Sequence, residues 1–185
     1  MNLKEEGRII LEDEGLLDII GEYGEFQIVG SYDLDLLIKP DIDISICVEK
    51  FEIDRYFSLC SEITKKLKPS RVKYIDQSLQ KLPFPFEEGY FLGLHIPRKD
   101  ILWTIDGWVF TPKIFKERVA SHNRIKEKLN RDTREILLTI KKSVCNNPNY
   151  ISTDLYNAVL FENVTSLHEF FAWYKRKYSK DFTQN

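Results

Sequence analysis

Strand-like patterns are confined to the first 110 residues of this chain of 185 residues, and only helix-like patterns follow them. Period-two alternation with β-branched and aromatic residues predicts strands at 25–29, 41–48, 71–75, 90–96 and 101–110. Helical spacing of apolar residues predicts helices at 14–22, 54–67, 112–128, 131–145, 153–162 and 166–178. Strands that lead and helices that trail indicate an α+β fold, in which a sheet domain precedes a helical C-terminal portion.

Proline-containing segments mark the breaks in this pattern. The stretch 81–89 contains Pro83 and Pro85, which cannot hold a regular strand ladder, so it is predicted to be a loop. Residues 97–100 separate two strand-like runs and predict a hairpin. Thr111 followed by Pro112 is typical of a helix start. We therefore predict two parts, residues 1–111 and residues 112–185.

Composition narrows the class of protein and its compartment. A chain with 43% hydrophobic and 13% aromatic residues is not intrinsically disordered. No apolar run approaches the roughly 18 residues that a membrane span needs, and residues 1–14 are charged where a signal peptide would be apolar. We therefore expect a cytoplasmic protein without a membrane partner. The three cysteines lack metal-ligand spacing and are expected to be reduced thiols.

Charge is distributed unequally along the chain. Residues 1–63 contain 16 acidic and 5 basic residues, whereas residues 64–185 contain 13 acidic and 22 basic residues. Either the two halves neutralise each other in the fold, or the acidic half concentrates cations while the basic half faces phosphates or an anionic partner. The net charge of -2 lacks the positive excess of a whole-surface nucleic-acid binder.

The chemistry is indicated by Val29-Gly30-Ser31 and, nine residues later, Asp41-Ile42-Asp43-Ile44. On a strand, Asp41 and Asp43 project from the same side, and their negative charges repel. A divalent cation offsets such repulsion, and Mg²⁺ prefers carboxylate and phosphate oxygens. Gly30 lets the backbone approach a ligand closely, and the Ser31 hydroxyl can bind phosphate oxygens.

This pattern resembles that of the nucleotidyltransferase superfamily with a DNA polymerase beta type of palm. The resemblance covers roughly residues 15–110. Asp106, between Trp103 and Trp108, matches the third carboxylate of that superfamily, and this strand is similar to that of small bacterial nucleotidyltransferase-like proteins. Lys39-Pro40 is similar to the GrpB-like branch. The fold that the resemblance implies is a mixed β-sheet palm.

The resemblance also implies an activity: transfer of a nucleoside monophosphate from a nucleoside triphosphate to an acceptor that the sequence does not identify. Asp41, Asp43 and Asp106 would hold two Mg²⁺ ions, with Mn²⁺ as a substitute. Asp106 would also accept the proton of the acceptor. The residues expected to bind the nucleotide are Gly30, Ser31, Tyr32 and Lys39. Antibiotic nucleotidyltransferases of the superfamily use a helical region to help hold the substrate.

One departure keeps an alternative open. Many active members continue after Gly-Ser with small residues, an Arg and another Gly, whereas residues 32–35 are acidic and bulky here. Lys39, or Arg98 and Lys99 in the predicted hairpin, would have to supply the missing positive charge. The alternative is a non-catalytic binding or interaction module with the same fold.

Several residues admit two interpretations. Residues 113–142 contain ten basic and four acidic residues, which form either a solvated helical face or a wall that faces phosphate or RNA. The second interpretation leaves RNA-associated or toxin–antitoxin action open. His95 either contacts the substrate or is structural. The aromatic residues 170–178 form either the buried side of the last helix or a stacking platform.

Overall fold

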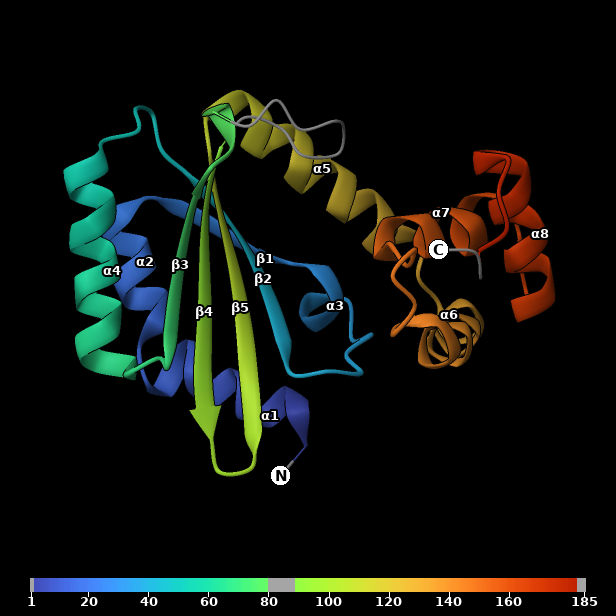
Figure 1. Cartoon of the computed structure of the whole chain (residues 1–185), viewed down its shortest axis with the longest axis horizontal. Helices are drawn as coiled ribbons and strands as arrows, with labels where there is room; N and C mark the ends of the chain where they lie inside the picture. The colour runs from blue at the N-terminus through green and yellow to red at the C-terminus, as the bar shows by residue number, and fades with distance from the viewer. Residues whose placement is uncertain (1, 80–88, 183–185) are drawn as a thin grey trace. The chain divides into compact units, whose positions relative to one another are not determined.

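The computed structural model describes residues 2–79 and 89–182, so most of the loop predicted at 81–89 lies outside the described residues. Five strands form one sheet in the order β1-β2-β5-β4-β3 (Figure 1). The strands are β1 (Glu25–Val29), β2 (Asp41–Cys47), β3 (Arg71–Asp76), β4 (Tyr90–Arg98) and β5 (Ile101–Phe110). β2 and β5 are parallel and the other neighbours are antiparallel, which confirms the predicted α+β fold with a mixed sheet.

Helices precede, interrupt and follow the strands. Those in and before the sheet region are α1 (Leu3–Arg8), a π-helix (Ile9–Asp13), α2 (Leu16–Tyr23), α3 (Gly30–Asp33), α4 (Ile53–Leu67) and a short 3₁₀ helix (Gln77–Leu79). Those after it are α5 (Pro112–Lys128), α6 (Arg131–Val144), α7 (Ser152–Phe161) and α8 (Leu167–Tyr178). No helix within the described ranges has both the length and the apolar character needed to cross a membrane.

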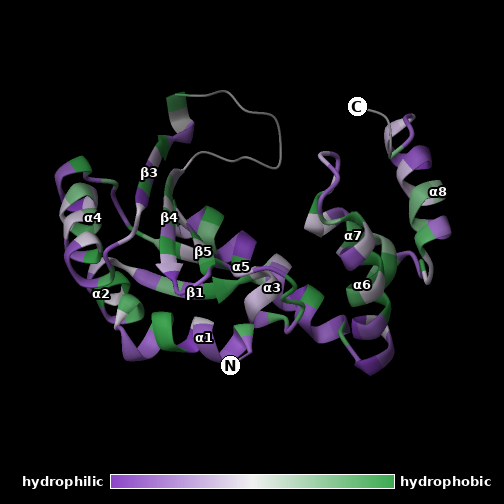
Figure 2. Cartoon of the chain, turned by 60° about the horizontal axis from the view of Figure 1, so that its bottom comes forward, coloured by the Kyte–Doolittle hydropathy of each residue, from purple (hydrophilic) through white to green (hydrophobic). Residues whose placement is uncertain are grey.

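The first helices differ from the prediction. The π-helix ends at Asp13, and Gly15, at φ +74°, is the N-cap of α2, so α2 begins at residue 16 rather than 14. The sequence did not predict α1, which is largely hydrophilic (Figure 2) and contributes few residues to the core. α3 is a single turn that follows β1, where the sequence predicted only a bend.

Along β2, buried isoleucines alternate with polar residues, which shows that one face of the sheet covers the core and the other does not. Ile42, Ile44 and Ile46 of β2 are fully buried and belong to a core that also contains Tyr56 and Ile63 of α4. α2 and the π-helix pack on the same face. Each fully buried side chain of this kind stabilises the fold by about 1.5–3 kcal/mol. Because side chains alternate, the residues between the isoleucines of β2 project to the opposite face.

The chain divides into two units, residues up to His122 and residues from Asn123. α5 extends across this division. A boundary between residues 111 and 112 therefore stays a prediction. In the second unit, Phe170, Trp173 and Tyr174 of α8 are buried, as expected for the inward side of the last helix.

Candidate functional site

The sheet carries two rows of polar side chains on the face opposite the apolar core. Paired residues on neighbouring strands project to the same side, as do residues two positions apart on one strand. One row across β2, β5, β4 and β3 contains Asp41, Thr104, His95 and Arg71. The next row contains Asp43, Asp106, Gly93 and Lys73. The sheet therefore brings the three carboxylates to one face, although Asp106 is more than 60 residues away in the sequence.

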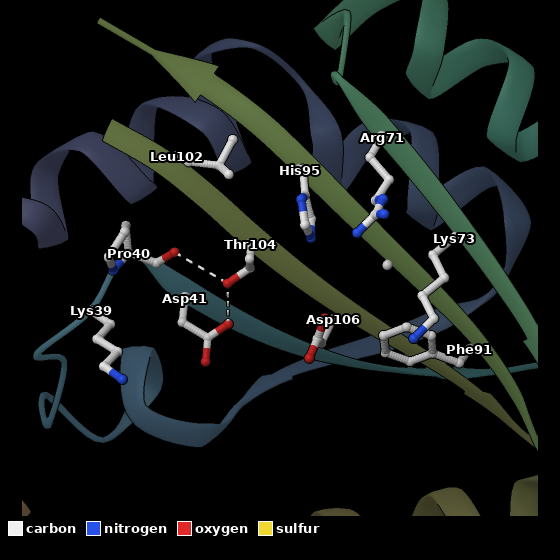
Figure 3. Close-up of a pocket in the computed structure, with 11 residues that line it drawn as sticks. Lys39, Pro40, Asp41, Arg71, Lys73, Phe91, His95, Leu102, Thr104 and Asp106 are labelled. Atoms are coloured by element: carbon white, nitrogen blue, oxygen red, sulfur yellow. Dashed lines mark hydrogen bonds between the residues drawn. The ribbon is translucent and has the colours of Figure 1, made fainter. Parts of the chain in front are cut away.

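A cavity of about 580 Å³ lies over these rows, a volume typical of ligand sites (Figure 3). Its lining residues are Lys39, Pro40, Asp41, Arg71, Lys73, Phe91, Gly93, His95, Leu102, Thr104 and Asp106. Figure 3 shows Asp41 and Asp106 in the middle, with Lys39 on one side and Arg71 and Lys73 on the other. Cations thus flank the carboxylates from two directions.

The carboxyl group of Asp106 is held in an environment that disfavours its charge. Burial is the main reason that its pKa rises from the usual 3.8 to about 6, and the negative charge of Asp41 raises it further. Lys73 acts in the opposite direction and lowers this pKa. A carboxylate with a pKa near 6 is a better proton acceptor at neutral pH than an ordinary one.

Asp41 is oriented by its neighbour on β5. The Thr104 hydroxyl donates to Oδ1 of Asp41 at 2.8 Å. The backbone N–H of Thr104 donates to the Pro40 carbonyl oxygen at 2.9 Å, which continues the β2–β5 pairing past the start of β2. Lys39 is exposed at the edge of the same cavity.

Gly30 and Asp43 are packed against each other. Gly30 adopts φ +68°, a conformation that favours glycine, and begins α3. A Cβ atom at this position would overlap Oδ2 of Asp43 and lie 2.8 Å from its Cγ. The Asp43 carboxylate therefore lies against Gly30 rather than in the cavity, and half-buried Ser31 follows at the same turn.

Tyr32 lies in the core beneath α1. Its side chain is 6% exposed, its hydroxyl donates to the Lys4 carbonyl oxygen at 3.2 Å, and the Lys4 ammonium is 4.1 Å from the ring centroid. A Cβ atom at Gly7 would meet the same ring. Because the ring is covered by these contacts, the structure offers no free face of Tyr32 on which a base could stack.

The hairpin residues considered as substitutes for the missing positive charge lie elsewhere. Arg98 pairs with Glu14, and Lys99 occupies the turn between β4 and β5 at φ +49°. Neither residue lines the cavity that contains Asp41 and Asp106.

Sequence reasoning missed Arg71 and Lys73 and assigned no chemistry to His122. The signal for the first two was present, because Arg71 and Lys73 are two positions apart on a predicted strand and must share a face. His122 of α5 is buried, and its Nε2 lies 2.7 Å from Oδ2 of Asp33. This pair fixes α5 to α3, the turn that begins at Gly30.

A metal ion needs ligand side chains that are close enough to bind it together, not only side chains on the same face of the sheet. Residues 2–79 and 89–182 contain no group of three or more His, Cys, Asp or Glu side chains already arranged to hold an ion. The donor chemistry nevertheless fits Mg²⁺, since the available ligands are carboxylate oxygens on adjacent strands.

Comparisons with known proteins identify the fold. No family model matches the chain, and no curated protein does. Solved structures do match, among them a cytoplasmic RNA terminal U-transferase, with a TM-score of 0.59 and 16% identity over 87% of this chain and 49% of that one. The Cid1 poly(U) polymerase matches with a TM-score of 0.59 and 14% identity over 85% of this chain and 48% of that one.

A chain of the non-canonical poly(A) polymerase complex GLD-2–GLD-3 also matches, with a TM-score of 0.59 and 11% identity over 99% of this chain and 60% of that one. This chain spans about half the length of the first two matched structures. At such low identity these matches establish the fold alone. The chain has a nucleotidyltransferase-type fold, in agreement with the resemblance seen in its sequence.

Proposed function

We propose that this chain is a metal-dependent nucleotidyltransferase, which transfers a nucleoside monophosphate from a nucleoside triphosphate to an acceptor. The observation that most supports the proposal is the strand register, in which Asp43 is opposite Asp106 and Asp41 is two positions away on the same face. The matched fold adds support, since one structure with it is a poly(U) polymerase described as bound to Mg and 3′-dATP.

Asp41, Asp43 and Asp106 would hold Mg²⁺, or Mn²⁺ in its place. Bound metal would supply charge neutralisation and orientation for the attacking and leaving oxygens. The three acids repel each other without a cation, and the raised pKa of Asp106 reflects part of that repulsion. Binding of a divalent cation is therefore expected to lower that pKa.

The proton of the acceptor would pass to Asp106. In the transfer step, the acceptor oxygen forms a bond to the α-phosphorus while the bond from that phosphorus to the bridging oxygen breaks. Pyrophosphate leaves with the bonding electrons, and the Asp106 carboxylate takes the hydroxyl proton. Near neutral pH this carboxyl is mostly ionised even without a cation, and the lower pKa expected with a bound cation keeps it ionised and able to take a proton.

The turn from β1 into α3 would bind the triphosphate. The missing side chain of Gly30 makes room for the Asp43 carboxylate, and Ser31 beside it carries a hydroxyl and a backbone N–H that would bind phosphate oxygens. Lys39, at the cavity edge, would contribute positive charge. Tyr32 would act by packing α3 against α1, not by contact with the base.

The Asp43→Asn variant tests this function. Wild-type and variant protein are incubated with α-labelled nucleoside triphosphates, Mg²⁺ or Mn²⁺, and pools of cellular RNA and small metabolites, and the transferred label is measured. We expect transfer by the wild type, loss to background in Asp43→Asn, and no change in a control variant, Glu62→Gln, that neutralises an exposed acid on α4. Full activity of Asp43→Asn would refute the mechanism.

A binding module with this fold is the second candidate. Two observations favour it: the Asp43 carboxylate lies against Gly30, and no metal-ready cluster exists in the described residues. Titration calorimetry with Mg²⁺ and ATP, followed by the transfer assay, separates the candidates. Nucleotide binding without transfer to any pool would favour the module, whereas transfer would exclude it.

A further inference from the structure

Arg71 and Lys73 lie at one end of the two polar rows, on the edge strand β3. Both project into the cavity, together with His95 of β4 (Figure 3). Gly93 lies between Lys73 and Asp106 in its row, and the Phe91 ring covers the space that a side chain at Gly93 would fill. The result is a small basic surface that adjoins the acidic centre.

These cations are available to a ligand. Arg71 and Lys73 are exposed, and no salt bridge between described residues includes either of them. The Lys73 ammonium lies 5.7 Å from the centroid of the Phe91 ring, which also lines the cavity. An arginine and a lysine directed into one cavity form a site suited to a phosphate, which an arginine binds with two parallel hydrogen bonds.

The position of this basic surface distinguishes the two substrates. Gly30 and Ser31 follow β1, on one side of the acids, whereas Arg71 and Lys73 lie on β3, on the other side. In-line transfer requires the attacking and leaving groups on opposite sides of the transferred phosphorus. If the leaving pyrophosphate lies near Gly30, the acceptor must approach from the side of β4 and β3.

We infer that Arg71, Lys73 and His95 bind a phosphate group of the acceptor. The acceptor is then a phosphorylated molecule whose reactive hydroxyl lies within about 10 Å of that phosphate, two strand spacings from β5 to β3. This inference rests on the proposed function, because it takes Asp106 as the place where the hydroxyl reacts. The phosphate belongs either to an oligonucleotide or to a small phosphorylated metabolite.

Binding of two probes distinguishes these sources. The probes are a short oligoadenylate with a free 3′-hydroxyl and ribose 5-phosphate, with unphosphorylated ribose as the negative control. Each is titrated by calorimetry into protein saturated with Mg²⁺ and a non-hydrolysable ATP analogue. We expect one phosphorylated probe to bind and ribose not to bind.

The double variant Arg71→Gln with Lys73→Gln tests whether these two side chains bind the phosphate of the probe. Its affinity for the bound probe should fall at least about tenfold, since two charge-assisted contacts are lost. For the oligonucleotide, the slope of log affinity against log salt should also shrink by about 0.7 for each lost contact. Affinity for the ATP analogue should not change, and the exposed α4 control Lys65→Gln should behave as the wild type.

Three results would overturn the inference: no phosphorylated probe binds the wild type, the double variant binds it equally well, or the affinity for the ATP analogue falls in parallel. Charged residues on an edge strand also discourage unwanted strand pairing, but that role predicts no selective loss of probe affinity. Retained transfer in Asp43→Asn would instead refute the proposed function while leaving the phosphate site intact. The two failures are therefore distinguishable.

Discussion

Neutralising Asp106 is predicted to stabilise the fold above pH 6. The folded protein holds this carboxyl at a pKa of about 6, above its usual 3.8, because of burial and the nearby charge of Asp41. Between these two values the folded state binds a proton that the unfolded state releases. The stability of the wild type therefore falls as pH rises through this window, and Asp106→Asn removes the loss.

The magnitude follows from the pKa difference. A rise from 3.8 to about 6 destabilises the ionised folded protein by about 3 kcal/mol once both states have lost the proton. At pH 4.5, where the folded protein retains most of the proton, the same relation gives about 1 kcal/mol. The free energy of unfolding of Asp106→Asn relative to the wild type should thus increase by about 2 kcal/mol between pH 4.5 and pH 8.

Urea unfolding of both proteins at the two pH values, with EDTA present, measures this change. Other titrating groups are common to both proteins and cancel in the difference. A stability difference that does not depend on pH would refute the account of Asp106, and so would a variant that is less stable than the wild type at pH 8. Added Mg²⁺ should stabilise the wild type and not Asp106→Asn, because only the wild type retains all three acids.

The remaining predictions concern packing around the site, and each is measured by urea unfolding. Gly30→Ala should destabilise the fold by about 1–3 kcal/mol, since the residue has a positive φ and its Cβ would overlap the Asp43 carboxylate; an unchanged midpoint would contradict this packing. His122→Ala should cost about 1–3 kcal/mol through loss of its buried hydrogen bond to α3. Tyr32→Phe should lower the free energy of unfolding by only about 0.5–1.5 kcal/mol, because the ring packs in the core and only one hydrogen bond is lost. Its affinity for Mg²⁺ and ATP should not change. A loss of nucleotide affinity in a fully folded variant would instead show that Tyr32 contacts the base directly.

Much of the fold was predictable because its elements have strong local periodicity. The alternation of Asp and Ile in β2 determines which face is buried, and the apolar spacing in α4 predicts a helix that packs on one side. α1 was not predicted, since a short hydrophilic helix lacks such a pattern. α3 was not predicted either, because one turn of helix is too short for periodicity to show.

The candidate site was predictable in part. Local pattern placed Asp41 and Asp43 on one side of a strand, and the resemblance to a superfamily brought in Asp106. Parallel pairing of β2 with β5 is a contact between distant segments, so no local signal fixes the register that puts Asp43 opposite Asp106. The position of Arg71 and Lys73 in the cavity could not be predicted for the same reason, because the sequence of residues 71–76 does not show which strand pairs with β3.

Tyr32 shows a different limit. An aromatic residue directly after a Gly-Ser turn is compatible with either base stacking or core packing. The choice depends on α1, which the sequence did not predict and which covers the ring.

A crystal of the wild-type protein soaked with Mn²⁺ and a non-hydrolysable nucleoside triphosphate tests the central claim most directly. We predict an anomalous scattering peak bonded to oxygens of Asp41, Asp43 and Asp106, with the triphosphate at Gly30 and Ser31. Bound nucleotide with no Mn²⁺ at these carboxylates, or Mn²⁺ only elsewhere on the protein, would contradict it.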